Sequence, residues 1–242
     1  MLGPKMDVVK PPSIPRRQRA RATRRKIIDA ARRLFADEGY ASTTMDAVAA
    51  EASVAVQTVY HVFHTKAELL RDVIQVASSG QHDPPAQVEP PWMQEVLSTL
   101  DGRRVLALSV EHGIDMAARV APLVGAINAA ASTDHDFARY WDTTCTTRRN
   151  GTTQLVTVLA TNGQLRPGLS AQRAADITYA TSSHETILAF LSVCGWPLAD
   201  VKAWFYTMLC HQLLAEEARR GDRPGFRSPT EGLSFDHLVS FS

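Results

Sequence analysis

The chain has 242 residues, of which 45% are hydrophobic and 21% charged, so it can bury a sizeable core and does not have the composition of a disordered chain. The formal net charge is only +1, yet residues 1–70 hold 12 Lys and Arg against 7 Asp and Glu, while residues 71–242 hold 14 against 18. This segregation, and not the overall charge, makes the N-terminal part the candidate for a polyanionic partner.

The cysteines and the hydropathy of the chain indicate the cellular compartment of the protein. The three cysteines, Cys145, Cys194 and Cys210, are odd in number and fit neither a paired disulfide framework nor a CxxC metal site, which favours a reducing compartment. No run of about 18 apolar residues is evident, and the N-terminus lacks the apolar region of a signal peptide. We therefore expect a soluble, cytoplasmic protein with no membrane partner.

The N-terminal residues change composition at position 16. Four prolines and few large apolar groups predict a flexible leader over residues 1–15. Residues 16–26 then carry seven basic side chains and no acidic one. They form either an arm that neutralises phosphates or enters a minor groove, for example through Arg19 and Arg21, or the solvated start of a helix. The motif that follows favours the arm.

Two helices joined by a tight turn are predicted next. Apolar residues at helical spacing indicate a first helix over residues 23–37, ended by Gly39. Thr43 and Thr44 offer hydroxyl caps for a second helix with a stripe of small apolar residues. A break at Ser53-Val54 precedes a third helix that is too short to be stable alone and must pack on its neighbour. This pattern is a helix-turn-helix.

The outward side of that third helix carries short or planar hydrogen-bonding groups without a charge cluster, which suits base edges and phosphates in a major groove. We predict that Gln57, Thr58 and His61 meet base edges. Thr44, Tyr60 and Lys66 are expected to contact phosphates. The full predicted DNA-binding set is Arg19, Arg21, Thr43, Thr44, Ala55, Gln57, Thr58, Tyr60, His61 and Lys66.

Over residues 20–75 the sequence resembles the N-terminal domain of TetR-type transcriptional repressors. The matching segments are Gly39-Tyr40, Thr43-Thr44, Asp46-Ala47-Val48-Ala49, Ala52-Ser53-Val54, Thr58-Val59-Tyr60, Phe63 and Lys66-Ala67-Glu68-Leu69. The chain departs from the family pattern at Ser53 and Gln57, where Gly is common, and at Ala55, where a Ser or Thr cap is usual. The missing cap costs about 1 kcal/mol, and the long amide of Gln57 predicts an unusual DNA sequence.

The rest of the chain is predicted to be a second helical domain. Residues 16–80 form the first domain, ended by a proline-rich linker that begins at Gly80, and residues 92–218 form the second, followed by a tail over residues 219–242. Helix breaks are expected at Gly102, Pro122, Ser132-Thr133, Asn162-Gly163, Pro167-Gly168 and Gly195-Trp196-Pro197. The fold class is therefore all-α, because no alternating strand pattern competes.

The resemblance implies the roles of this second domain. It implies a homodimer on a palindromic operator of double-stranded DNA, paired through a four-helix interface built from the helices expected near residues 171–193 and 198–217, with Leu209 and Leu213 as candidate interface positions. It also implies a site for a small, mostly apolar effector that releases the DNA. The candidate effector-binding residues are Met116, Tyr140, Trp141, Cys145 and His184. A helix over residues 65–78, capped by Thr65, links the domains and is the expected lever.

Other functional classes have weaker support. Cys145 with His184 suggests a thiol nucleophile and its base, but no activating motif surrounds either residue, and a structural buried cysteine is the commoner state. The sequence has no Gly-rich phosphate loop, no Gly-x-Ser-x-Gly and no HExxH, and its histidines are scattered. We expect no catalytic residues, no metal and no cofactor. An enzyme or a helical interaction scaffold stays as the alternative.

Overall fold

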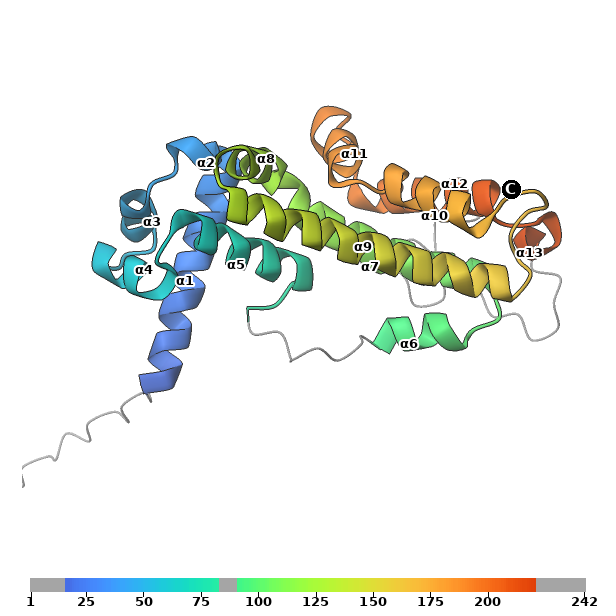
Figure 1. The fold of residues 1–242 in the computed structure, drawn as a ribbon, viewed down its shortest axis with the longest axis horizontal. Coiled ribbons are helices and arrows are strands. Elements are labelled where there is room, and N and C mark those ends of the chain that lie inside the picture. The colour runs from blue at the N-terminus through green and yellow to red at the C-terminus, as the bar shows by residue number, and fades with distance from the viewer. Residues whose placement is uncertain (1–15, 83–90, 221–242) are drawn as a thin grey trace, which may run out of the picture.

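The computed structural model describes residues 16–82 and 91–220, and these residues are almost entirely helical (Figure 1). The helices are α1 (Arg16–Asp37), α2 (Gly39–Ser42), α3 (Met45–Glu51), α4 (Val56–Phe63), α5 (Lys66–Ser79), α6 (Pro91–Ser98), α7 (Gly102–Val120), the 3-10 turn η1 (Ala121–Leu123), α8 (Val124–Thr133), α9 (His135–Thr161), α10 (Ala171–Thr181), α11 (His184–Leu188), the π-helical segment η2 (Ala189–Val193), α12 (Leu198–Leu213) and α13 (Glu216–Arg220). The described residues pair in extended form only at an isolated bridge between Leu165 and Leu214. The all-α prediction is confirmed.

The first helix is longer than the sequence predicted. It begins at Arg16 instead of near residue 23, so the basic segment 16–26 is the start of a helix, and its contacts with phosphates stay a prediction. The helix ends at Asp37, and Gly39 follows with φ of 80°, a left-handed conformation that glycine adopts without strain. The leader over residues 1–15, the linker core over residues 83–90 and residues 221–242 of the tail lie outside the described residues and stay predictions.

The helix-turn-helix consists of α3, a turn and α4, and its caps match the sequence. The hydroxyl of Thr44 accepts a hydrogen bond from the Ala47 amide at 3.0 Å at the start of α3. Ala55 occupies the cap position of α4 and forms no side-chain cap bond there. In the turn, Ser53 has φ of 54°, which explains why the resembled family usually carries Gly at this position.

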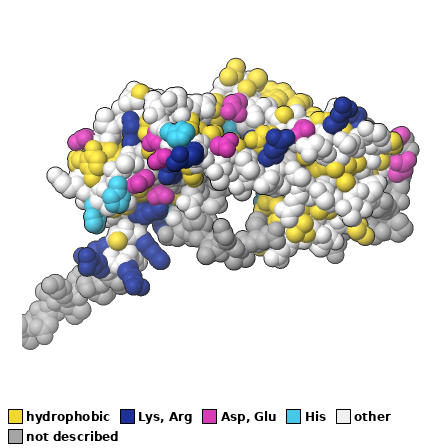
Figure 2. All heavy atoms as spheres, viewed as in Figure 1, with side chains coloured by type: hydrophobic (Ala, Val, Ile, Leu, Met, Phe, Trp, Pro, Cys, Tyr) yellow, Lys and Arg dark blue, Asp and Glu magenta, His cyan; other side chains and the backbone are white. Residues whose placement is uncertain are grey.

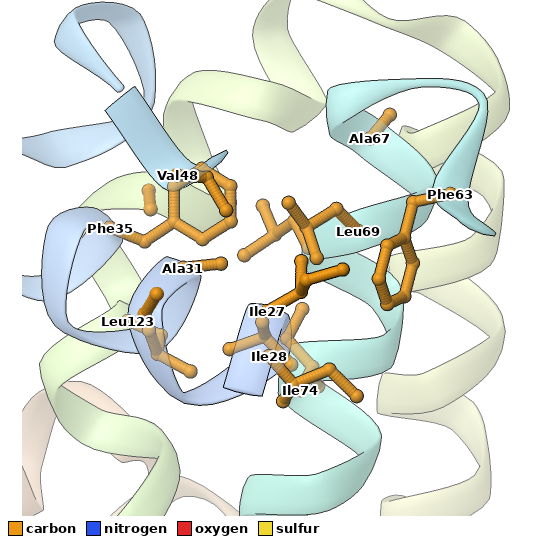
Figure 3. Close-up of a cluster of buried hydrophobic side chains, with 14 of the residues drawn as sticks. Ile27, Ile28, Ala31, Phe35, Val48, Phe63, Ala67, Leu69, Ile74 and Leu123 are labelled. Carbon is orange, nitrogen blue, oxygen red and sulfur yellow. The ribbon is translucent and has the colours of Figure 1, made fainter. Parts of the chain in front are cut away.

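A shared hydrophobic core holds α1 to α5 together and extends into the larger region, which consists of residues 91–220. Figure 3 shows Val48 of α3 and Leu69 of α5 converging with Ile27, Ile28 and Phe35 of α1. Leu123 of η1 lies in the same cluster and is fully buried, and the cluster continues through buried residues of α8 and the start of α9, namely Ala126, Ile127, Ala130 and Phe137. The end of α7, α8 and the start of α9 therefore complete the core of the N-terminal domain, across the boundary expected from sequence.

The larger region is organised around the long helices α7 and α9, with α12 packed on α7 and α10 packed on α9 (Figure 1). Helix breaks fall where the sequence predicted them, but two expected helices are divided further. A break at Leu214 divides the helix expected over residues 198–217. Another divides the helix expected over residues 171–193. There the Ser182 hydroxyl donates to the Thr178 carbonyl at 2.6 Å, and the Ser183 hydroxyl accepts from the Thr186 amide to start α11. Serine hydroxyls compete with backbone hydrogen bonds, which favours helix ends over helix interiors.

The stretch Gly102–Thr133 is long and apolar enough to span a membrane by length and composition, contrary to the sequence expectation. It consists of α7, η1 and α8, and half of its most apolar window is buried inside the protein. Such burial is what a core helix of a globular protein shows.

Candidate nucleic-acid interface and ligand cavity

The outward face of α4 is exposed and uncharged. Gln57, Tyr60 and His61 are exposed on it, and Tyr60 keeps 47% of its accessible surface. Thr58 is half-buried, and Ala55 is exposed at the start of the helix. Val59 and Phe63 are buried on the opposite face, so they fix the rotation of α4 about its own axis. The arrangement presents amide, phenol, hydroxyl and imidazole groups together, which can donate to and accept from base edges and phosphates.

Helix α1 braces α4 and α5 from the side. Arg24 forms an ion pair with Asp72 of α5 at 2.6 Å, and its guanidinium lies 5.6 Å from the ring centroid of Phe63 at the end of α4. Both members of the ion pair are partly exposed. The contact orients the start of α1 relative to the short helix, which does not form stably alone.

Basic side chains gather on the first turns of α1, where this helix projects from the body of the molecule (Figure 2). Arg19 and Arg21 are exposed there, as are Arg16, Arg17, Arg25 and Lys26. In Figure 1 this end of α1 projects on the same side as α4. A basic helix start beside an exposed polar helix face has the charge pattern of a phosphate-contacting surface.

Thr43 and Lys66 have a different place from the one predicted. Thr43 is fully buried, and its hydroxyl donates to the Gly39 carbonyl at 2.8 Å, so it cannot contact DNA through its side chain. The amine of Lys66 donates to the carbonyls of Tyr40 at 2.6 Å and Thr43 at 2.9 Å, and lies 4.3 Å from the Tyr40 ring centroid. Burial lowers the pKa of Lys66. The lysine therefore ties α5 to the end of α2, where helix carbonyls lack partners.

Thr44 keeps an exposed position suited to a phosphate contact, although its hydroxyl also caps α3. The predicted surface is thus reduced to Thr44, the exposed face of α4 and the basic start of α1. Sequence reasoning missed the structural role of Lys66 because its carbonyl partners lie 23 and 26 residues earlier in the chain.

A cavity of about 230 Å³ lies in the larger region among α6, α7, α9, α10 and α12. Its walls are mostly apolar. The principal apolar lining residues are Trp92, Met93, Leu106, Val110, Ile114, Met116, Leu155, Phe205 and Leu209. The polar lining residues are Ser109, His112, Arg148, Thr152, Thr178 and Ser182. A mostly apolar cavity with a few polar groups is the usual form of a small-molecule site.

Two lining residues stack at one side of this cavity. The rings of Trp92 and His112 lie 4.9 Å apart at an interplanar angle of 18°. Burial lowers the pKa of His112, although nearby Glu111 and Asp115 oppose this shift. The imidazole is therefore neutral at pH 7 and can offer one donor and one acceptor.

Of the predicted effector residues, only Met116 lines the cavity. Tyr140 packs on Phe137 and on Arg71 of α5, whose guanidinium lies 5.2 Å from the Tyr140 ring centroid. Trp141 lies against buried His184, with ring centroids 5.9 Å apart, and Cys145 is half-buried outside the lining. Tyr140 shares α9 with the cavity but lies about two turns before its nearest lining residue on that helix. Helical spacing alone did not reveal which face of α9 lines the cavity.

Both long helices of the cavity also contact α5. On α7, Arg119 donates to the carbonyls of Ala77 at 2.8 Å and Ser78 at 3.0 Å, at the end of α5. On α9, Tyr140 stacks under Arg71 of α5. The cavity walls and the helix-turn-helix are therefore joined by two continuous helices and one common partner, α5. Among residues 16–82 and 91–220, no three His, Cys, Asp or Glu side chains are grouped to hold a metal ion.

Comparisons with known proteins agree with this geometry. Residues 27–73 match the family model described as bacterial regulatory proteins, tetR family. Over 88 residues the chain is 35% identical to an uncharacterized HTH-type transcriptional regulator, TtgW, of Pseudomonas putida. This alignment covers 34% of the chain and 63% of that relative.

Solved structures share the fold over most of the chain. A SmeT–triclosan complex matches 85% of this chain and 96% of its own with a TM-score of 0.59 at 22% identity. A gamma-butyrolactone receptor described as ArpA-like matches 83% and 92% with a TM-score of 0.54 at 20% identity. The fatty acid degradation regulator FadR from Bacillus halodurans matches 77% and 94% with a TM-score of 0.60 at 17% identity. At these identities the likeness establishes the helical fold.

Proposed function

We propose that the chain, whose residues 27–73 match the model of bacterial regulatory proteins of the tetR family, is a cytoplasmic, ligand-responsive transcriptional repressor. It binds a palindromic operator as a homodimer and leaves the DNA when a small, mostly apolar effector fills the cavity. The observation that carries the proposal is the exposed, uncharged face of α4 beside the basic start of α1. The first supplies contacts to base edges, and the second supplies contacts to phosphates.

The proposed dimer uses an exposed apolar surface formed by η2, the following turn and α12. Val193 keeps 82% of its accessible surface, Trp204 40% and Trp196 38%, and Phe190 links the two tryptophans with ring centroids 4.9 Å from each. Hydrophobic side chains also gather over α11 in Figure 2. A contiguous apolar patch of this kind favours an isologous partner. Leu209 and Leu213, the interface positions expected from sequence, are buried within one chain and support its core instead.

A matched pair of variants tests this interface. Val193→Lys adds a charge to the apolar surface and should convert dimers to monomers with poor operator affinity. Leu100→Lys changes an exposed leucine, 67% accessible, that lies before α7 and away from this surface. It should leave the dimer intact. Light scattering at micromolar concentration measures both, and a monomeric wild type would end the proposal of a dimer.

The proposed switch moves α5. A ligand in the cavity contacts α7 and α9, and those helices touch α5 through Arg119 and Tyr140. A small displacement of α5 would shift the helix-turn-helix packed on it and change the separation of the two recognition helices in the dimer, which a palindrome fixes at about 34–36 Å. A ligand can shift this equilibrium only by its differential affinity for the two arrangements, and coupling of about 1–3 kcal/mol corresponds to roughly 5–150-fold weaker DNA binding.

Relatives of the same fold give the effector part of the proposal its support. One solved neighbour is a complex with triclosan and another is a gamma-butyrolactone receptor. The cavity of this chain has the apolar walls that a small organic ligand needs. Release of the operator, as opposed to recruitment, follows from the resemblance to TetR-type repressors.

Selection of bound duplexes from a random pool, using the purified full-length protein, tests the proposed function. The expected result is a single palindromic sequence whose half-sites lie one helical turn apart, with affinity that falls steeply as salt rises. Recovery of no preferred sequence at about 100–200 mM salt, or of a sequence without two-fold symmetry, would contradict the operator proposal. The palindrome then serves as the probe for every test below that involves DNA.

A further inference from the structure

The cavity carries one charged side chain among the residues that the structure describes. Arg148 of α9 lines it, and no Asp or Glu does. The other polar groups are hydroxyls and the imidazole of His112. A lone cation in an apolar wall is unusual, because the charged form loses solvation there unless a partner compensates for it.

Arg148 has few partners for its donors. One terminal nitrogen donates to the Ser182 carbonyl at 3.2 Å, and the guanidinium stacks on the ring of Tyr179 at 4.0 Å from its centroid. Its Nε is buried and has no hydrogen-bond partner. No carboxylate pairs with this guanidinium within the described part of the chain. A guanidinium has five N–H donors in a planar fork, so most of its capacity remains for a ligand.

The neighbouring arginine provides the contrast. Arg149 is exposed on the same helix and forms an ion pair with Asp176 of α10 at 2.9 Å. The chain thus supplies an acidic partner to the arginine that faces solvent and none to the arginine that faces the cavity. Packing of α9 on α10 explains the stack of Arg148 on Tyr179, but it leaves the buried Nε unexplained.

The His184 imidazole and the Cys145 thiol, which both interact electrostatically with Arg148, do not neutralise it. Burial first, and then the charge of Arg148, lower the pKa of His184 to about 4, so this imidazole is uncharged at pH 7. Burial raises the pKa of Cys145, although Arg148 opposes this shift, so the thiol is protonated there. Glu185 and Asp142 also act electrostatically on these two residues. Neither carboxylate forms an ion pair with Arg148.

From this geometry we infer that the cavity ligand is a small amphipathic anion, whose carboxylate pairs with Arg148 while its apolar body fills the space between α6, α7 and α12. The inference rests on the proposed function, since it names the chemical class of the effector. A cavity of about 230 Å³ is about one and a half times the roughly 150 Å³ that holds benzene, which limits the body to about one or two rings. Charge-assisted, bidentate hydrogen bonds make arginine a selective partner for carboxylates.

Calorimetric titration with three matched pairs of ligands tests the inference. The pairs are benzoate with benzamide, 4-ethylbenzoate with 4-ethylbenzamide, and 2-naphthoate with 2-naphthamide, added to the full-length protein at about pH 7.5. Each amide keeps the shape of its acid but removes the charge and replaces one acceptor oxygen with an NH2 donor, which a guanidinium cannot pair with. We expect at least one acid to bind about ten-fold or more tightly than its amide. If no acid binds more tightly than its amide, the inference is overturned.

Variants locate the effect. Arg148→Met should abolish the preference for the acid, and Arg149→Met, the matched control on the same helix, should keep it. Arg148→Lys retains the charge without the fork and should preserve a weaker preference, which covers the case in which Arg148→Met does not fold. An acid preference that survives in folded Arg148→Met, or that disappears equally in Arg149→Met, would contradict the assignment.

Operator binding separates this inference from the proposed function. If an acid binds through Arg148 but leaves affinity for the selected palindrome unchanged, the inference stands and the proposed switch fails. If a neutral ligand releases the operator while no acid is preferred, the proposed function stands and the inference fails.

Discussion

The recognition surface and the cavity are built in opposite ways. The recognition surface on α4 comes from one short segment. Its exposed side chains lie within a few residues of the buried side chains that anchor the helix, as Tyr60 does beside Val59. The cavity is assembled from five helices spread between Trp92 and Leu209. Local spacing therefore determines the first site, whereas long-range packing determines the second. Changes that break tertiary contacts should affect the two regions unequally.

The largest effect is expected at Lys202 of α12, which is 4% exposed and pairs with Glu111 at 2.9 Å and Asp115 at 2.8 Å, both on α7. Lys202→Ala leaves two carboxylates without their buried cation and should cost about 3–5 kcal/mol of unfolding free energy. Arg33→Ala breaks the exposed pair with Glu51 of the first region and should cost less than about 1 kcal/mol. Urea unfolding measures both. Equal costs would remove the contrast between the regions.

A smaller effect is expected from pH, through His184 of the larger region. Its pKa is about 4 in the folded protein, against about 6.5 when unfolded. Above about pH 6.5 both states are neutral and the residue has no effect, but as pH falls towards 4 the unfolded state takes up a proton that the native state excludes. Stability should therefore drop by about 2–3 kcal/mol between about pH 7 and pH 4.5 on this account. His184→Leu should lessen the drop by that amount in urea titrations at the two pH values. An unchanged drop would show that His184 is not the group responsible.

The smallest of the three main effects is expected at Lys66, in the helix-turn-helix domain. Lys66→Met removes two charged hydrogen bonds to the carbonyls of Tyr40 and Thr43 and should cost about 1–2 kcal/mol of stability, moderated by the partial exposure of the lysine. Because its amine is held by these carbonyls, the salt dependence of operator binding should not change. Arg21→Ala, on the exposed start of α1, should reduce the salt slope by about one unit and leave stability unchanged. A reduced slope in Lys66→Met would restore the phosphate contact predicted from sequence.

The sequence was sufficient for the fold class, the helix-turn-helix and most helix ends, because caps, glycines and apolar spacing act over a few residues. Thr44 and Thr65 cap the starts of α3 and α5, and Gly80 ends α5, as their chemistry predicts. It also identified the residues on the outer face of α4, since Val59 and Phe63 fix which side is buried.

The sequence was insufficient for the roles of Thr43, Lys66 and the cavity. Thr43 and Thr44 are equivalent capping residues by sequence alone. Thr43 is buried because of the packing of α2, which the sequence does not reveal. Tyr140 and Arg148 lie on the same helix, yet Tyr140 contacts α5 whereas Arg148 lines the cavity. Arg148 was missed because its partners, Tyr179 and Ser182, are far away in the chain. A basic residue in an otherwise apolar helical stripe is the one signal that points to Arg148.

Whether α4 selects the DNA sequence is measured through the affinity of wild type and Gln57→Ala for the selected palindrome and for all single-base variants of one half-site. Gln57 is exposed on α4 and its amide can make two hydrogen bonds to one base. Gln57→Ala should lose about 1–3 kcal/mol of discrimination at one position of the half-site and keep the preferences at the others. A uniform loss of affinity for every duplex, with all base preferences retained, would contradict this prediction.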